Sequence, residues 1–210
     1  MPVRRISEIA QEPSANLLRI IFSEKKASAR GPAIFIDRDG VINQRRPDDY
    51  VLNWSQFVFV PGIREALKQL STLGLPMIVI SNQAAVGKGL LTLDGLREIT
   101  TRMQQALLED GTALTAAYYC PHRSEENCAC RKPRPGLLHM AANDLNVNLS
   151  RSVLVGDSET DIKAAEAAGS RSILLVSNSR NLGSSVGVTS TPVVYSTAEV
   201  FDAAEKLLSQ

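Results

Sequence analysis

The 210-residue sequence has no long hydrophobic run. Its longest clean apolar stretch covers residues 75–80, whereas a membrane-spanning helix needs about 20 apolar residues. Arg4 and Arg5 stand near the start, but the apolar run over residues 17–22 is interrupted by Arg19 and lacks a small-residue cleavage pattern. We therefore expect no membrane partner and no secretion signal.

The sequence also lacks an excess of charge of either sign, and it is poor in aromatic residues. Lys and Arg number 23 against 22 Asp and Glu, and there are one Trp, four Tyr and five Phe. Binding to nucleic acid without sequence preference needs a basic surface with stacking aromatics, so we expect no nucleic-acid partner. With 44% hydrophobic and 21% charged residues, the composition is that of one folded domain with appendages.

Cysteine is scarce and unevenly placed. The three cysteines, Cys120, Cys128 and Cys130, all fall within eleven residues. An odd number so close together does not make a disulfide framework and suits a metal site in a reducing compartment. We therefore expect a cytoplasmic protein.

From residue 33 onward, short apolar runs alternate with longer helical patterns. The runs have consecutive Ile, Val and Leu, as in strands buried on both faces, and most helical patterns end at a glycine. The alternation predicts an α/β fold, a Rossmann-like parallel sheet with helices on both faces. We expect strands over residues 33–36, 75–80, 114–119, 152–155, 172–176 and 193–195, and helices over 62–73, 93–109, 159–168 and 197–208, with a short helix after Pro135.

Two segments fall outside this alternation. We assign residues 33–210 to the α/β domain and residues 1–32 to an N-terminal extension of unknown role, with one helix expected over residues 16–22. Residues 177–190 are rich in Ser, Gly and Asn and are predicted to form a loop.

Polar clusters follow four of the predicted strands. Asp37-Arg38-Asp39-Gly40 follows the first, Ser81-Asn82-Gln83 the second, Cys120 the third and Gly156-Asp157 the fourth. Ligands of open parallel sheets bind beyond the carboxyl ends of the strands, so these clusters should converge. Asp37 and Asp39 alternate and so point the same way, and together with Asp157 they suit a hard cation such as Mg²⁺.

These residues resemble the haloacid dehalogenase-like phosphatases. The first motif of that family, Asp-x-Asp-Gly, is similar to residues 37–40, the second to Ser81, the third to Lys132, and the fourth, Gly-Asp-x-x-x-Asp, to residues 156–161. The Ser-Asn-Gln triplet and the Cys-Pro-His with Cys-x-Cys-Arg-Lys-Pro resemble the branch that contains the D-glycero-D-manno-heptose 1,7-bisphosphate phosphatases and the histidinol phosphatases. The resemblance covers about residues 33–176.

The resemblance implies a Mg²⁺-dependent hydrolysis of a phosphate monoester. Asp37 would be the nucleophile that forms an aspartyl-phosphate, and Asp39 would protonate the leaving oxygen and then deprotonate water. Mg²⁺ would be held by Asp37, the Asp39 carbonyl and Asp157. Ser81 and Lys132 would stabilise the transferred oxygens.

The cysteine cluster supplies three sulfurs and one imidazole, from Cys120, His122, Cys128 and Cys130. Four soft ligands of this kind favour tetrahedral zinc and leave no open coordination position. We therefore expect a structural zinc ion in a small loop over residues 120–130. The Arg131-Lys132 pair that follows indicates that the loop aims Lys132 at phosphate.

The substrate is expected to be a small phosphorylated metabolite, with a heptose 1,7-bisphosphate that loses its 7-phosphate as the first choice and histidinol phosphate as the alternative. A second phosphate would need cations, and an amine would need acids such as Asp48 and Asp49. The candidate substrate-binding residues are Asn82, Gln83, Arg131, Arg45, Arg46 and Lys88.

Two other classes fit the sequence less well. A zinc-stabilised nucleic-acid-binding module conflicts with the balanced charge and the few aromatics. A phospho-accepting receiver domain has its acceptor Asp after a later strand, whereas here the acidic pair follows the first. We expect a monomeric enzyme.

Overall fold

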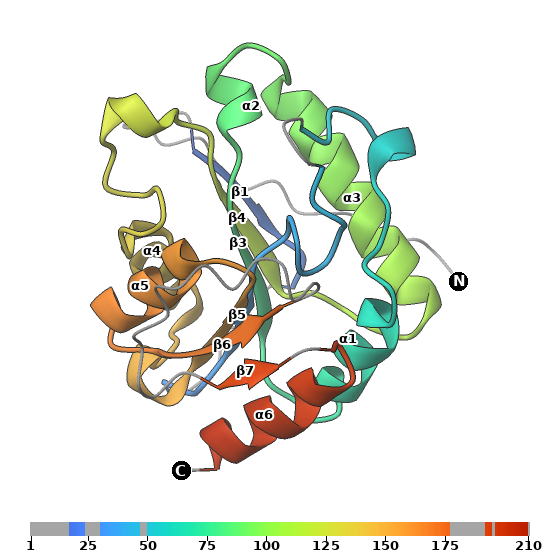
Figure 1. Ribbon diagram of the computed structural model, residues 1–210, viewed down its shortest axis with the longest axis vertical. Helices are drawn as coiled ribbons and strands as arrows, with labels where there is room; N and C mark the ends of the chain where they lie inside the picture. Colours follow the sequence, from blue (N-terminus) through green and yellow to red (C-terminus); the bar gives the residue numbers. More distant parts are fainter. Residues whose placement is uncertain (1–16, 24–29, 47–49, 177–191, 195, 210) are drawn as a thin grey trace.

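The computed structural model describes residues 17–23, 30–46, 50–176, 192–194 and 196–209 (Figure 1). All six expected strands form, and so do the five helices expected after residue 33, with ends shifted by at most two residues from the expected bounds. The short predicted loop 177–190 lies outside the described residues. The elements are β1 (Leu18–Ile21), β2 (Ile34–Ile36), α1 (Ile63–Ser71), β3 (Met77–Asn82), α2 (Ala84–Gly87), α3 (Leu93–Glu109), β4 (Ala116–Cys120), α4 (Gly136–Leu145), β5 (Val153–Gly156), α5 (Glu159–Ala167), β6 (Arg171–Leu175), β7 (Val193–Val194) and α6 (Glu199–Leu208).

The strands form one sheet in the order β1-β4-β3-β2-β5-β6-β7. Every pairing is parallel except that of β1 with β4. From β2 the chain builds outward through β3 to β4 on one side and then through β5 to β7 on the other. The order therefore reverses at β2, and ligands bind at such a switch point in open α/β sheets.

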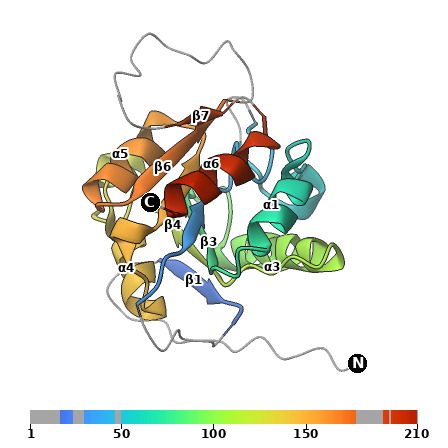
Figure 2. The same cartoon turned by 90° about the horizontal axis from the view of Figure 1, so that it is seen from below.

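Two hydrophobic cores lie on opposite faces of the sheet, as alternating strand residues require. Ile34 and Ile36 belong to the core under α1, α3 and α6, whereas Phe35 belongs to the core under α4 and α5. The view from below shows these two helix layers on either side of the strands (Figure 2). The predicted α/β class, with helices on both faces, is confirmed.

The helix expected over residues 16–22 is wrong, because residues 18–21 form strand β1. Its residues pair with β4 from Leu18 opposite Tyr119 to Ile21 opposite Ala116. Leu18 and Ile20 enter one core and Ile21 the other, with a period of two. This segment is too short to be stable as a helix on its own, and pairing with β4 stabilises it as a strand.

The longest described helix, α3, has 17 residues. Among the described residues, no helix has the length and apolar character needed to cross a membrane.

Candidate active site

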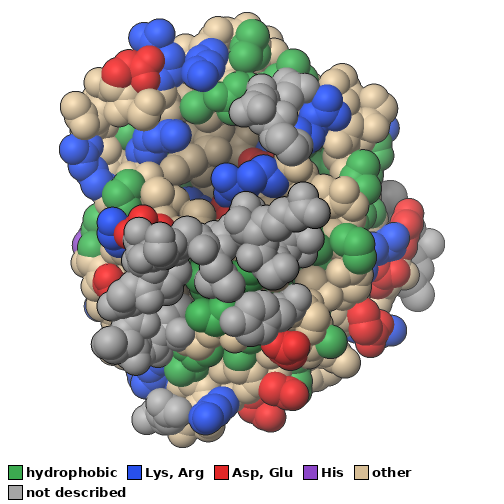
Figure 3. Space-filling view, in the orientation of Figure 1, with side chains coloured by type: hydrophobic (Ala, Val, Ile, Leu, Met, Phe, Trp, Pro, Cys, Tyr) green, Lys and Arg blue, Asp and Glu red, His purple; other side chains and the backbone are tan. Residues whose placement is uncertain are grey.

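A cleft of about 990 Å³ lies beyond the carboxyl ends of β2 and β3. Asp37, Asp39, Ser81 and Lys132 line it together. In the space-filling view, Lys and Arg side chains gather around a hollow near the middle of this face (Figure 3). These residues come from three segments that are distant in sequence, and they meet in one cavity as the strand-end rule predicts.

Asp37 stands at the floor of the cleft, directly after β2. Its backbone N–H donates to the Val155 carbonyl at 2.9 Å, which continues the pairing of β2 with β5. The Arg38 N–H donates to its carboxylate Oδ1 at 2.7 Å, and Lys132 Nζ lies 2.9 Å from the same oxygen. Burial raises the pKa of Asp37 to about 7, although Lys132 opposes that rise.

Lys132 is buried and reaches the floor from the loop after the cysteine cluster. Its Nζ donates to the Ile80 carbonyl at 2.9 Å and to Asp161 Oδ1 at 2.5 Å, in addition to pairing with Asp37. Burial lowers its pKa, but the attraction of Asp161 and Asp37 outweighs burial and raises the pKa overall. Lys132 is therefore a fixed ammonium between two carboxylates.

Three carboxylates form a cluster that fits a hard cation. One oxygen from each of Asp37, Asp157 and Asp161 lies within 4.8 Å of the others. Oxygen donors of this number and spacing fit Mg²⁺ with substrate and water completing its shell. Burial raises the pKa of Asp157 against the opposing charge of Arg45, whose Nη2 lies 2.8 Å from Asp157 Oδ1.

The Asp39 carboxylate accepts hydrogen bonds from three side chains. Arg38 Nη2 donates to both of its oxygens, at 2.9 and 3.0 Å, Asn43 Nδ2 donates to Oδ1 at 2.9 Å, and Gln83 Nε2 donates to Oδ2 at 2.6 Å. Burial raises the pKa of Asp39, but Arg38 and these donors outweigh it and lower the pKa overall. Asp39 is thus an ionised carboxylate with a defined orientation.

The Ser81-Asn82-Gln83 triplet connects the end of β3 to the other catalytic segments. The Ser81 hydroxyl is buried and accepts a hydrogen bond from Gln83 Nε2 at 3.2 Å. The Asn82 amide makes two bonds with the Lys132 backbone, donating to its carbonyl and accepting from its N–H, both at 3.0 Å. The contacts described for Asn82 and Gln83 therefore hold Lys132, Asp39 and Ser81 in place, and substrate binding by Asn82 and Gln83 stays a prediction.

Cys120, His122, Cys128 and Cys130 come together beside the cleft. Their ligand atoms lie within 4.8 Å of one another, with Cys130 Sγ 3.2 Å from Cys120 Sγ and His122 Nδ1 3.3 Å from Cys130 Sγ. A hydrogen bond from Cys130 lowers the pKa of Cys120 to about 5. Three sulfurs and one imidazole nitrogen at this spacing fit a tetrahedral zinc ion.

Basic side chains surround the cleft at its rim. Arg45, Arg46, Lys88 and Arg131 all line it, and Lys88 Nζ lies 5.3 Å from the centre of the Tyr50 ring. Arg131 Nη1 donates to the His122 carbonyl at 3.2 Å. The predicted set of cations is therefore brought to one cavity, whereas Asp48 and Asp49 lie outside the described residues.

The residues of the site that received no individual role from the sequence include Arg38, Asn43, Tyr50 and Asp161. Asn43 and Asp161 are buried and bind Asp39 and Lys132, and Tyr50 contacts Lys88. Asp161 had a detectable signal, since it closes the Gly-Asp-x-x-x-Asp motif. Asn43 and Tyr50 gave none, because their importance depends on how the loop after β2 turns back.

Comparison with known proteins agrees with this geometry. The HAD-hydrolase-like family model matches residues 129–196. A D-glycero-beta-D-manno-heptose-1,7-bisphosphate 7-phosphatase of Helicobacter pylori is 41% identical over 145 residues, which are 69% of this chain and 82% of that protein. A D-glycero-alpha-D-manno-heptose-1,7-bisphosphate 7-phosphatase of Mycobacterium tuberculosis is 40% identical over 133 residues, 63% of this chain and 70% of that protein.

A solved structure extends the similarity to the fold. The D,D-heptose 1,7-bisphosphate phosphatase from B. bronchiseptica, complexed with magnesium and phosphate, is 32% identical and superimposes with a TM-score of 0.76. The match covers 85% of this chain and 98% of that one. The predicted resemblance is confirmed: the chain belongs to the haloacid dehalogenase-like phosphatases, in the group of the heptose bisphosphate phosphatases.

Proposed function

We propose that this phosphatase removes the 7-phosphate of a D-glycero-D-manno-heptose 1,7-bisphosphate and leaves the 1-phosphate. The observation that carries the chemistry is the buried Asp37, which faces Lys132 and two further carboxylates at the floor of a basic cleft. The names of the relatives support the substrate, and they include both anomers at nearly equal identity.

The mechanism assigns the first step to Asp37. Its carboxylate oxygen attacks phosphorus and forms an aspartyl-phosphate, while Asp39, which must first take up a proton from solvent when the phosphate binds, gives that proton to the departing sugar oxygen. In the second step Asp39 removes a proton from water, which attacks the phosphoryl group and frees Asp37. Lys132 and the Ser81 hydroxyl stabilise the charge on the transferred oxygens, because both are fixed before substrate arrives.

Asp37, Asp157 and the carbonyl of Asp39 are the residues that would hold Mg²⁺, and the Asp161 carboxylate lies in the same cluster of acidic side chains. When bound, the ion neutralises the repulsion between the carboxylates and the phosphate. Cys120, His122, Cys128 and Cys130 are the proposed zinc ligands. Their cluster ends two residues before Lys132, which supports a structural role for zinc in placing that ammonium.

Two phosphates need two groups of cations. Lys132 serves the phosphate that reacts, and Arg45, Arg46, Lys88 and Arg131 are available at the rim for the one that stays. A single nucleophile at the floor explains why only one phosphate would leave in each binding pose. We also propose that the enzyme is a monomer of the cytoplasm; the three free cysteines, gathered in one cluster, support a reducing compartment.

The test is a phosphate-release assay of the full chain with Mg²⁺ on both anomers of the heptose bisphosphate, histidinol phosphate and simple sugar phosphates. We expect a heptose bisphosphate to have the highest kcat/KM and to yield the 1-phosphate, identified by phosphorus NMR. The Asp37→Asn variant should fold but lose nearly all turnover, because an amide does not attack phosphorus. A preference for histidinol phosphate would refute the substrate, and an active Asp37→Asn variant would refute the mechanism.

A further inference from the structure

Arg38 is a deeply buried charged side chain that lines the cleft, with a relative exposure of 1%. It is the residue between the two aspartates, and its guanidinium turns to Asp39. Nε and Nη2 donate to Asp39 Oδ1 at 3.2 and 2.9 Å, and Nη2 also donates to Oδ2 at 3.0 Å. Because a buried charge is costly unless it is well paired, this bidentate ion pair between Arg38 and Asp39 should have a fixed geometry.

Gln83 completes a closed ring with the same two residues. Its Oε1 accepts from Arg38 Nη2 at 3.0 Å, and its Nε2 donates to Asp39 Oδ2 at 2.6 Å. The amide can satisfy both partners in only one orientation, because the guanidinium has no acceptor and the carboxylate has no donor. Asp39 is therefore held at both oxygens by groups that are themselves fixed.

On the side of the core, the Arg38 guanidinium packs against the Tyr119 ring. Its guanidinium carbon lies 5.9 Å from the centre of the Tyr119 ring on β4, and the Thr100 hydroxyl of α3 bonds to the Tyr119 hydroxyl at 2.9 Å. Both residues are fully buried. The grip on Asp39 is thus anchored in the core, and 27% of the Asp39 side chain stays open to solvent.

We propose that Arg38 is a positioning residue that, with Gln83, holds the Asp39 carboxylate in the one orientation used for both proton transfers. This inference rests on the proposed function. An aspartate has several side-chain rotamers, and a misplaced acid or base loses much of its effect. Arg38 touches neither phosphate nor leaving group in this role and acts through Asp39.

The inference predicts a dependence on the leaving group. A sugar oxygen needs a proton from Asp39 to leave, whereas 4-nitrophenolate leaves without one. Hydrolysis of the aspartyl-phosphate needs Asp39 as the base with either substrate. Loss of Arg38 should therefore slow phosphoryl transfer from the sugar, spare transfer from 4-nitrophenyl phosphate, and cause the phosphoenzyme to accumulate.

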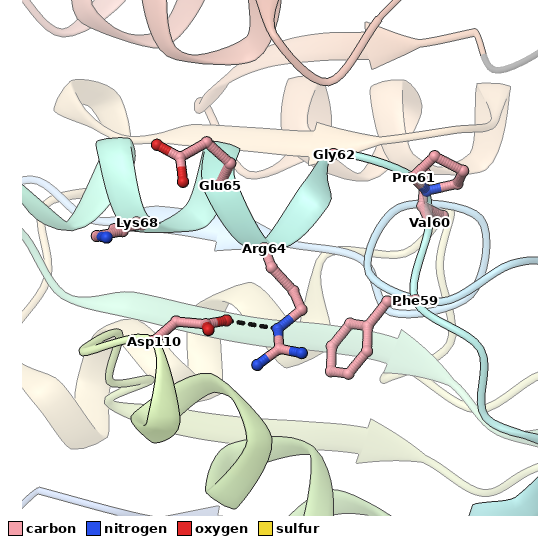
Figure 4. A pocket seen from close by; sticks show the side chains of 8 residues that line it. All are labelled: Phe59, Val60, Pro61, Gly62, Arg64, Glu65, Lys68 and Asp110. Atoms are coloured by element: carbon pink, nitrogen blue, oxygen red, sulfur yellow. Dashed lines mark hydrogen bonds and ion pairs between the residues drawn. The ribbon is translucent and has the colours of Figure 1, made fainter.

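A matched control is available in a second pocket, of about 500 Å³, beside α1 (Figure 4). There the Arg64 guanidinium pairs with Asp110 and lies 5.4 Å from the centre of the Phe59 ring. Arg64 thus makes the same types of contact as Arg38, with a carboxylate and an aromatic ring, but away from the catalytic cleft. Arg64→Lys therefore controls for replacing an arginine that pairs with a carboxylate and an aromatic ring outside the cleft, although Arg64 is 40% exposed and Arg38 only 1%.

The experiment compares wild type, Arg38→Lys, Asp39→Asn and Arg64→Lys. A lysine keeps the charge but lacks the planar fork that grips two oxygens. With the heptose bisphosphate we expect Arg38→Lys to lower kcat by at least roughly 10²-fold, within the range for loss of acid–base catalysis, with KM changed less than about threefold. With 4-nitrophenyl phosphate we expect a burst of nitrophenolate at the wild-type rate, then slow turnover, with phosphoenzyme seen by intact-mass spectrometry.

Asp39→Asn should show the same pattern, and Arg64→Lys should behave as wild type. If Arg38→Lys does not fold, Gln83→Leu tests the same grip without leaving a buried ion unpaired. The role of Arg38 would be overturned if the Arg38→Lys variant lowered the nitrophenolate burst rate as much as it lowers kcat on the heptose bisphosphate. It would also be overturned if the loss of kcat/KM came from a higher KM. Wild type without activity on any phosphate ester would instead refute the proposed function, and the two failures are thus distinct.

Discussion

Replacing Gly40 by alanine should displace a proposed metal ligand, the Asp157 carboxylate, without replacing any aspartate. Gly40 follows Asp39 with a φ of +96°, and its N–H donates to the Asn43 carbonyl at 2.7 Å. A Cβ built on it would overlap Oδ2 and Cγ of Asp157 and stand 3.1 Å from Oδ1. Both the positive φ and the missing Cβ are therefore needed for Asp157 to reach its place.

The structure allows the two effects to be separated. A side chain at positive φ costs about 1–2 kcal/mol, and Gly74, with a φ of +67° and nothing within 4 Å of its Cβ position, would show only this effect. In Gly40→Ala the overlap adds about 1–3 kcal/mol, the usual cost of forcing an extra group into a packed site. We expect Gly74→Ala to lose about 1–2 kcal/mol of unfolding free energy and Gly40→Ala about 2–5 kcal/mol.

The decisive assay is a calorimetric titration of each variant with Mg²⁺, accompanied by urea unfolding and phosphate release. Because Asp157 must move, Gly40→Ala should bind Mg²⁺ at least roughly 10-fold to 100-fold more weakly, the loss typical of a disturbed ligand environment. Gly74→Ala should bind Mg²⁺ as wild type does. Equal Mg²⁺ affinity in the two variants would refute the placement of Asp157 in the metal site.

Two further predictions concern zinc and pH. The Cys128→Ser variant should contain no zinc by elemental analysis, while its sheet stays folded. Its kcat/KM should fall and should not recover on added Mg²⁺, because the loop before Lys132 becomes less ordered. Full activity of zinc-free wild type would contradict this prediction. The raised pKa of Asp37, about 7 against an ordinary 3.8, means that the folded chain holds a proton there that the unfolded chain has lost. In the presence of a metal chelator, the thermal stability of the protein should therefore fall as the pH rises from about 4 to about 7. In a second series without chelator, added Mg²⁺ should stabilise the protein most near pH 7. A thermal stability that rises between about pH 4 and about pH 7 in the chelator series would show that Asp37 is ionised throughout.

Sequence patterns were sufficient where one strong rule decides the outcome. Asp37, Ser81 and Asp157 follow apolar strands, and parallel strands bring their carboxyl ends together, so their convergence could be predicted. The cysteine cluster could be predicted because its four ligands are close in sequence. Lys132 could be placed only through the resemblance, since no local pattern shows that a loop lysine enters the interior.

The roles of Arg38 and Gln83 could not be predicted in the same way. Alternation indicates that Arg38 points away from the nucleophile, but it does not reveal that Gln83, which directly follows β3, meets it there. Likewise, β1 was missed because a short apolar run fits a buried helix as well as a strand, and its partner β4 is distant in the sequence. In each case the deciding partner is distant in sequence, so only the three-dimensional arrangement identifies it.

The antiparallel strand β1 has a consequence for how the protein is handled. It occupies one side of β4, whose five residues are all buried and include two tyrosines. A truncated chain without residues 18–21 would present this strand as an open, apolar edge, the kind of template on which chains aggregate. Because β1 contributes no residue to the catalytic cleft, such a truncation should reduce the soluble yield far more than the activity per correctly folded molecule.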